Sequence, residues 1–280
     1  MKARETFRAD PRLKLREADA GRRLLGASAK SGNARRDKGE LKELDRAKTA
    51  GLIDRIAHLQ AMLYAQHKQK VLLVLQGMDT AGKDGTVRAM FSRINPMGIR
   101  GVAFKQPTET ELAHDYLWRV HQQVPIKGEI AIFNRSHYED VLITKVQGWI
   151  DDAKCQRRYA QIRDFERMLA ETGTVIVKVF LHISHEEQRK RLQARLDDPD
   201  KQWKFNPADL EQRKKWKAYQ RAYETAIRET SVAHAPWYVV PANSKTHRNL
   251  AIASILLETL EGMQLSFPPT DPALSAIKVQ

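Results

Sequence analysis

A glycine-rich segment directly after an apolar run holds the residues best suited to bind phosphate. Gly77, Gly82 and Lys83 form the pattern G-x-x-x-x-G-K, and a helical pattern follows them. In such a loop the backbone N–H groups converge on phosphate oxygens, the helix N-terminus adds a favourable dipole, and the lysine supplies a cation. The spacing therefore predicts a P-loop. Its other expected phosphate contacts are Met78, Thr80, Ala81, Asp84 and Gly85.

Two carboxylates distinguish this loop from a standard ATP-binding P-loop. The position after the lysine, normally a Ser or Thr that helps to hold Mg²⁺, is Asp84, and Asp79 lies inside the loop. A carboxylate beside bound phosphates repels them unless a divalent cation lies between. We therefore expect Asp79 to serve Mg²⁺, or Mn²⁺, or the phosphoryl acceptor. Asp84 is either a weaker candidate for the same role or a carboxylate favoured by the helix dipole.

A second polar cluster, Asn134–Asp140, follows another apolar run. In a P-loop fold the strand beside the loop commonly ends in a carboxylate that positions the metal, and here Asn134 stands at that place. Glu139 and Asp140 can supply the charge instead, and Arg135 can grip a phosphate through its planar guanidinium. The sequence therefore predicts metal ligands among these carboxylates.

The same cluster also fits a helix start. Ser136 as N-cap with Glu139 three positions later forms a capping box, and capping is compatible with a role in the site. As members of the site, Asn134, Ser136 and Tyr138 are expected to contact phosphate or nucleotide.

Basic residues gather in the segment 186–215, which reads as a helix followed by a loop. In many kinases a helical lid closes over the phosphates with arginine side chains, which neutralise charge and exclude water. We expect such a lid here, with Arg191 and Arg195 acting in catalysis and Lys204 binding phosphate. The alternative is a solvated helix face.

The elements that position these residues follow a regular alternation of apolar runs and helical patterns. This alternation predicts an α/β fold, a three-layer α/β/α sandwich of the P-loop kinase type with a parallel five-stranded sheet and a helical lid. The expected strands are Lys70–Leu75, Gly101–Phe104, Glu129–Phe133, Thr174–His182 and Trp237–Pro241. The expected helices are Asp37–His67, Gly82–Ile94, Glu109–Val124, His137–Val146, Asp152–Glu171, His185–Leu196, Pro207–Thr230 and Lys245–Glu261.

The first 36 residues lack the regular alternation of apolar runs and helical patterns. Residues 1–36 carry Pro, Gly and many charges without a sustained period, so we expect an extended or partly mobile basic arm that wraps a partner subunit or a neighbouring face. Residues 37–280 are expected to form a single domain.

Composition narrows the range of partners. The net charge of +14 favours a polyanion such as nucleic acid, an anionic membrane or a phosphate polymer. No apolar run approaches the roughly 20 residues that span a bilayer, and no secretory signal is evident. Cys155 is the only cysteine, which excludes an intrachain disulfide and fits a reducing cytoplasm, and its expected place is semi-buried in a helix.

Four motifs in order make the chain similar to the polyphosphate kinase 2 family. They are LQGMDTAGKDGTV, FKQPT, FNRSHYEDVL and RLDDPDKQWKFNPADL. The resemblance runs from about Lys70 to about Ala242. The motif F-N-R-S-x-Y-E-D, with Asn134 and Glu139, resembles that of the class III subgroup of the family.

The resemblance implies reversible transfer of the terminal phosphoryl group of inorganic polyphosphate to AMP or ADP. It further implies Mg²⁺ and a homodimer or homotetramer, with guanine nucleotides as a further acceptor class and with neither nucleic acid nor membrane as partner. The matching positions are Gly77, Asp79, Gly82 and Lys83 in the first motif, Asn134, Arg135, Ser136, Tyr138, Glu139 and Asp140 in the second, and Arg191 and Arg195 in the lid.

The predicted mechanism is in-line attack of a nucleotide oxygen on the terminal phosphoryl group. The expected catalytic residues are Asp79, Lys83, Arg135, Glu139, Arg191 and Arg195, and the expected metal ligands are Asp79, Glu139 and Asp140. Two alternatives stay open. An ATP-dependent nucleoside-monophosphate kinase would share the fold, and a non-catalytic nucleic-acid-binding protein would use the basic arm, although no regular aromatic stacking positions accompany the charges.

Overall fold

The computed structural model describes residues 2–25, 37–277 and 279. At its centre lies a parallel sheet with the strand order β2-β3-β1-β4-β5. The strands are β1 Lys70–Gly77, β2 Ile99–Ala103, β3 Ile130–Asn134, β4 Thr174–His182 and β5 Trp237–Pro241. The run VLLVL in β1 is fully buried because helices cover both faces of the sheet. The predicted five-stranded parallel sheet is confirmed.

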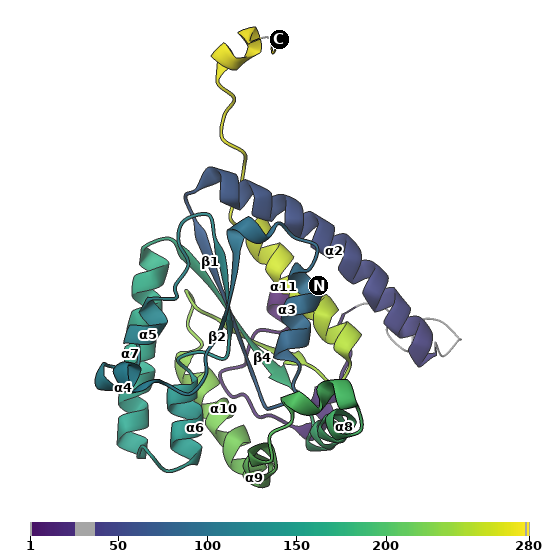
Figure 1. Ribbon diagram of the computed structural model, residues 1–280, viewed down its shortest axis with the longest axis vertical. Helices are drawn as coiled ribbons and strands as arrows, with labels where there is room; N and C mark the ends of the chain where they lie inside the picture. Colours follow the sequence, from purple (N-terminus) through teal and green to yellow (C-terminus); the bar gives the residue numbers. More distant parts are fainter. Residues whose placement is uncertain (1, 26–36, 278, 280) are drawn as a thin grey trace.

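Helices form a layer on each side of the sheet (Figure 1). One layer contains α2 Lys38–Gln66, α3 Lys83–Phe91 and α11 Lys245–Glu261. The other contains α5 Trp118–His121, α6 Glu139–Val146, α7 Asp152–Glu171 and α10 Trp216–Thr230, with α4 Glu109–Ala113 beside them. At the carboxyl edge of the sheet lie α8 His185–Leu196, the 3-10 helix Pro199–Lys204 and α9 Ala208–Lys214. The predicted α/β/α sandwich is therefore correct.

Two expected helices are interrupted. The helix expected at Glu109–Val124 is two short helices, α4 and α5, because Asp115 forms a turn by accepting a hydrogen bond from the N–H of Leu117 at 2.9 Å. The helix expected at Pro207–Thr230 breaks at Lys215, where the backbone leaves the helical region between α9 and α10. Both breaks lie at the edge of the sheet where the site is built.

The first residues of the chain cover an edge of the sheet. Ala9 donates to the carbonyl of Trp237 at 2.8 Å, and Val239 donates to the carbonyl of Phe7 at 2.8 Å, so this segment pairs briefly with β5. Phe7 is 2% exposed, and α1 Ala3–Thr6 packs on α11. The segment 2–25 thus protects the edge strand of its own domain. Residues 26–36 of the expected arm lie outside the described residues.

Two smaller predictions concern membranes and the single cysteine. No helix in the described parts of the chain combines the length and apolarity needed to cross a bilayer. Cys155 lies buried in α7, with its Sγ 3.9 Å from the carbonyl oxygen of Val141, so its expected place inside a helix is confirmed.

Candidate active site

The P-loop connects β1 to α3 in a strained conformation. Thr80 and Gly82 have φ angles of 64° and 100°, and left-handed backbone at a non-glycine residue is characteristic of ligand sites. Lys83 is 8% exposed and donates to the carbonyl of Gly77 at 2.8 Å. Burial, together with the charge of Arg135, lowers the pKa of Lys83 to about 8. The loop thus holds a desolvated lysine whose charged form a bound anion stabilises.

Further cations lie against this loop. Arg191 donates to the carbonyls of Thr80 and Ala81 at 3.0 and 3.1 Å, and Arg248 donates to the carbonyl of Ala81 at 3.3 Å. Burial, and then the charge of Arg191, lower the pKa of Arg248 to about 10. The pKa of Lys245 is lowered by burial and by both arginines. These groups repel one another, so the region favours a polyanion.

Sequence reasoning missed two members of this group. Arg248 and Lys245 lie in the first turns of α11, more than 160 residues after the P-loop. The sequence SKTHR at that helix start resembles an ordinary capped helix, and Ser244 does cap it by accepting from the N–H of His247. Only the fold brings these cations to the loop.

A cavity of about 380 Å³ opens beside the P-loop, and we call it the P-loop cavity. Asp79, Arg135 and Glu139 line it, and Arg135 forms an ion pair with Asp79 at 2.7 Å. Burial alone would lower the pKa of Arg135, but Glu139 and Asp79 outweigh it and raise that pKa. The structure therefore brings together three residues that the sequence assigned to catalysis.

The amide of Gln76 helps to orient Glu139. In the orientation that satisfies both of its ends, this amide donates to Glu139 Oε1 at 3.0 Å and accepts from Ser136. Gln76 is buried at the end of β1. Its hydrogen bond therefore fixes the Glu139 carboxylate relative to the rigid sheet.

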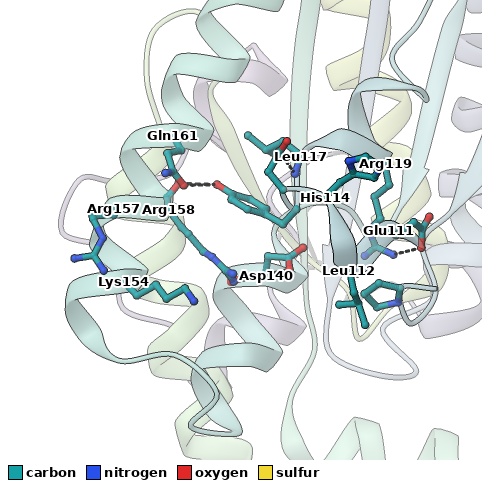
Figure 2. A pocket seen from close by; sticks show the side chains of 13 residues that line it. Glu111, Leu112, His114, Leu117, Arg119, Asp140, Lys154, Arg157, Arg158 and Gln161 are labelled. Carbon is teal, nitrogen blue, oxygen red and sulfur yellow. Dashed lines mark hydrogen bonds and ion pairs between the residues drawn. The ribbon is translucent and has the colours of Figure 1, made fainter. Parts of the chain in front are cut away.

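Asp140 does not share the cavity of its neighbour Glu139. It lines a separate cavity of about 600 Å³ together with Arg119 and Arg158 (Figure 2). Its pKa is raised by burial, although Arg158, 3.8 Å away, opposes this rise. Successive residues of a helix point about 100° apart, which separates the two carboxylates. The structure therefore places Asp140 and Asp79 on different cavities, and a metal role for Asp140 stays a prediction.

Ser136 and Tyr138 lie in the core instead of facing a ligand. Both side chains are 0% exposed, and Ser136 Oγ accepts from the N–H of Tyr138. The hydroxyl of Tyr138 donates to Glu166 at 2.9 Å and accepts from Lys178 at 2.9 Å. Both side chains are thus engaged in a buried polar network, and their contact with phosphate or nucleotide stays a prediction. Their place is behind the site, where they hold the start of α6.

Asn134 and Asp84 contact each other at the mouth of the P-loop. Asn134 Nδ2 donates to Asp84 Oδ1 at 2.6 Å, and Lys204 lies 3.8 Å from the other carboxylate oxygen. Asp84 therefore links the end of β3, the start of α3 and the expected lid. Its carboxylate also lies in the first turn of α3, where the helix dipole favours it.

The expected lid segment contributes a wall of the P-loop cavity. Gln188 of α8 donates to the carbonyl of Asp79 at 3.1 Å, and Arg195 Nη1 donates to the carbonyl of Lys204 at 3.3 Å. Asp209 of α9 lines the cavity, and its pKa is raised by burial and by the charge of Asp79. The sequence did not single out Gln188 or Asp209, because neither is one of the basic residues that marked this segment.

Comparison with known proteins places this geometry in a family. Residues 40–268 match the sequence profile described as Polyphosphate kinase 2. The chain belongs to the polyphosphate kinase 2 family. An AMP/ADP-polyphosphate phosphotransferase from Meiothermus ruber is 57% identical over 226 residues, which cover 81% of this chain and 85% of that protein. The resemblance stated from the motifs is thereby confirmed.

Two further relatives agree with this assignment. An ADP-polyphosphate phosphotransferase from Rhodopseudomonas palustris is 45% identical over 233 residues, covering 79% of this chain and 81% of that protein. The crystal structure of Polyphosphate Kinase 2 from Arthrobacter aurescens superposes with a TM-score of 0.85 at 43% identity, covering 98% of this chain and 95% of the other.

The polyphosphate kinase 2 site of this chain offers few protein ligands to a metal. Asp79 and Glu139 are two carboxylates on one cavity, and the described residues contain no group of three or more His, Cys, Asp or Glu side chains placed to hold an ion. Mg²⁺ is commonly bound by one or two carboxylates, with substrate phosphates and water completing its octahedron. The residues present therefore fit Mg²⁺ bound together with a phosphate substrate.

Proposed function

We propose that this chain transfers the terminal phosphoryl group of inorganic polyphosphate to AMP and to ADP, reversibly. The observation that carries the proposal is the group of cations at the P-loop: Lys83, Arg191, Lys245 and Arg248. Among the described residues, neither Lys245 nor Arg248 forms an ion pair with a carboxylate. A chain with about one negative charge per phosphate relieves their mutual repulsion at several points.

The transfer proceeds by attack of a nucleotide phosphate oxygen on the terminal phosphorus of polyphosphate. A new P–O bond forms to the nucleotide, and the P–O bond to the next phosphate breaks. The shortened chain leaves with the electron pair of that bond. Lys83 and Arg135 face the reacting groups and stabilise the charge that spreads over the phosphoryl oxygens. Arg191 acts behind the loop, where it positions the carbonyls of Thr80 and Ala81.

Asp79 and Glu139 would hold Mg²⁺, or Mn²⁺, beside the phosphates. When bound, the ion neutralises phosphate charge and orients the phosphoryl group. Acceptance of both AMP and ADP is supported by the name of the Meiothermus ruber relative and by the F-N-R-S-x-Y-E-D wording. We include guanine nucleotides as a further acceptor class and a homodimer or homotetramer as the assembled form.

The deciding assay supplies long-chain polyphosphate, Mg²⁺ and ADP without ATP, and measures ATP formed. We expect ATP to accumulate, and ADP to accumulate when AMP is the acceptor. The alternative is an ATP-dependent nucleoside-monophosphate kinase. Absence of ATP from polyphosphate, together with ADP formed from ATP and AMP, would reject the proposal in favour of that kinase.

A variant tests the role of the cation group directly. Arg248→Gln removes a charge 3.3 Å from the loop carbonyl of Ala81, so we expect the KM for polyphosphate to rise about tenfold while the KM for ADP changes little. Arg228→Gln, an exposed arginine in the last turn of α10, is the matched control and should leave both values unchanged. Circular dichroism checks that both variants fold.

A further inference from the structure

The expected lid segment joins the rest of the domain at two junctions. It comprises α8, the 3-10 helix Pro199–Lys204 and α9, at the carboxyl edge of the sheet (Figure 1). α8 begins at His185, shortly after β4 ends. α9 ends at Lys214, and α10 begins at Trp216 after the break at Lys215. Because hinges are commonly residues at the ends of elements, these two junctions are the positions about which a lid would turn.

The two junctions lie side by side. The ring centroids of His185 and Trp216 are 4.9 Å apart. Arg213, near the end of α9, donates to the carbonyl of His185 at 2.7 Å and to Oε1 of Gln188 at 2.9 Å. The lid segment therefore leaves the domain and returns to it at one place, where a single group can contact both of its ends.

The carboxylate of Glu17 is that group. Its Oε2 accepts a hydrogen bond from the backbone N–H of His185 at 2.7 Å. Its Oε1 accepts from the indole N–H of Trp216 at 2.9 Å and from the side-chain amide of Gln220 at 3.3 Å. The first N–H groups of a helix have no partner inside the helix, and the helix dipole favours a negative charge there. One carboxylate thus divides its two oxygens between the starts of α8 and α10.

The backbone that carries Glu17 is fixed to the domain. Glu17 is the first residue of a 3-10 helix of five residues. On one side of it, the carbonyl of Arg16 accepts from Nε2 of His182, the last residue of β4, at 2.8 Å. On the other side, Ala20 is 0% exposed, and its carbonyl accepts from the N–H of Asn243 at 3.1 Å. Glu17 therefore has a rigid support at the carboxyl edge of the sheet.

The helices that Glu17 contacts extend to the phosphate site. Gln188, one turn into α8, donates to the carbonyl of Asp79 at 3.1 Å. Arg191, in the next turn, donates to two carbonyls of the P-loop. Tyr219, one turn into α10, lines the P-loop cavity. The positions of the two helix starts therefore determine where these side chains meet the site.

We propose that Glu17 is a positioning residue for the phosphoryl transfer, which holds both hinges of the lid against the sheet. With both hinges held, the basic part of the lid closes over the polyphosphate from a defined position, and α8 keeps its contacts with the P-loop. Glu17 itself does not line the P-loop cavity, so it acts through α8 and α10. This inference rests on the proposed transfer from polyphosphate, and it gives the N-terminal segment a role in the site.

Hydrogen exchange of the backbone amides, measured by mass spectrometry, tests whether Glu17 holds the hinges. In Glu17→Ala we expect exchange in the first two turns of α8 and of α10 to become about tenfold faster, because both helices lose a charged acceptor. Asp19→Ala is the matched control. Asp19 lies in the same 3-10 helix, and its carboxylate forms an exposed ion pair with Arg22 at 3.3 Å. This control should change the exchange of neither helix.

Kinetic constants test the role of Glu17 in the reaction. In Glu17→Ala we expect the KM for polyphosphate to rise about tenfold, while the KM for ADP stays within about twofold. A loss of folded protein would lower kcat alone, so the rise in KM distinguishes positioning from stability. Glu17→Gln keeps one acceptor oxygen, which can hold only one hinge, and its KM should lie between those of Glu17→Ala and the wild type. Asp19→Ala should match the wild type.

The outcomes separate the two proposals. If the wild type makes no ATP from polyphosphate and ADP, the proposed function is refuted whatever the exchange shows. If the wild type is active but Glu17→Ala leaves either the KM for polyphosphate or the exchange of α8 and α10 unchanged, the role of Glu17 is refuted. Faster exchange confined to residues 7–24 would show that Glu17 only attaches the N-terminal segment. Equal rises in both KM values would show a general loss of the site, and either result would overturn the inference.

Discussion

The buried lysine of β4 provides a prediction whose size follows from the structure. Lys178 and Glu166 are both 0% exposed, and their side chains form an ion pair at 2.5 Å. Lys178 also donates to the carbonyl of Thr230 at 2.8 Å and to the hydroxyl of Tyr138 at 2.9 Å. Lys178→Met keeps most of the volume but leaves the Glu166 carboxylate buried without its cation.

The expected loss is large because an uncompensated charge remains inside the core. Breaking one partner of a buried ion pair costs about 3–5 kcal/mol. In a chain of this size each kcal/mol lowers the Tm by about 2–4 °C, so we expect a decrease of about 6–20 °C at pH 7.

The loss should depend on pH with a definite sign. Burial raises the pKa of Glu166, but Lys178 and His137 outweigh it, so in the wild type this pKa lies below its ordinary value of 4.5. The wild type therefore loses this stabilisation as the pH falls below 4.5. In Lys178→Met burial acts without the lysine and raises the pKa, so the penalty grows as the pH rises through that value. The difference between the two proteins should shrink as the pH falls from 7 towards 4.5.

Thermal unfolding followed by circular dichroism at pH 7 and pH 5 measures both effects. The double variant Lys178→Met/Glu166→Gln removes the orphaned charge and should recover part of the loss at pH 7. If Lys178→Met were as stable as the wild type, or if the double variant were less stable than the single one, the account of a compensated buried charge would be refuted.

Other predictions concern the P-loop. Because the pKa of Lys83 is about 8 in the free protein, kcat/KM for polyphosphate should fall as the pH rises through 8, and a flat profile from pH 7 to 9 would contradict this. Gly82→Ala places a methyl group 2.0 Å from Arg248 Nη1 and should lower kcat/KM at least about tenfold. Asp79→Asn should raise the Mg²⁺ concentration for half-maximal activity about 10- to 100-fold, whereas Asp140→Asn should leave it unchanged.

A glycine elsewhere in the chain provides a control for Gly82→Ala. Gly51 lies on the exposed side of α2, and an added methyl group there meets nothing within 4 Å. Gly51→Ala should leave kcat/KM unchanged and stabilise the helix by about 0.5–1 kcal/mol. Equal kinetic effects of the two substitutions would show that the close contact with Arg248 is unimportant.

The arrangement of the sheet could be predicted from the sequence because its signal is local. The run VLLVL and the glycine-rich loop after it are contiguous, so strand, loop and helix are evident in one segment. The polar cluster Asn134–Asp140 follows a second strand in the same direction. Since the carboxyl ends of parallel strands meet at one edge, the proximity of Arg135 and Glu139 to Asp79 was predictable as well.

Other parts of the site depend on contacts that no local pattern reveals. The run VIVKVFL predicted a strand buried on both sides, but it does not indicate that Lys178 has Glu166 as a buried partner 12 residues away on α7. Arg248 and Lys245 reach the P-loop only through the packing of α11 on α3. The direction of Asp140 depends on the residue at which α6 begins, and a helix start is uncertain by a few residues when read from sequence.

The first residue of α6 is held in place by the core, so the stability of the core and the geometry of the site are connected. Tyr138 is the N-cap residue of α6, and its side chain is held by Lys178 and Glu166 inside the domain. The anchored turn sets Glu139 towards the P-loop cavity and Asp140 towards the separate cavity that Arg119 and Arg158 line. Sites built on rigid elements hold their groups more accurately than sites on loops. The buried ion pair therefore helps to align Glu139 in the site, although neither Lys178 nor Glu166 lines the P-loop cavity.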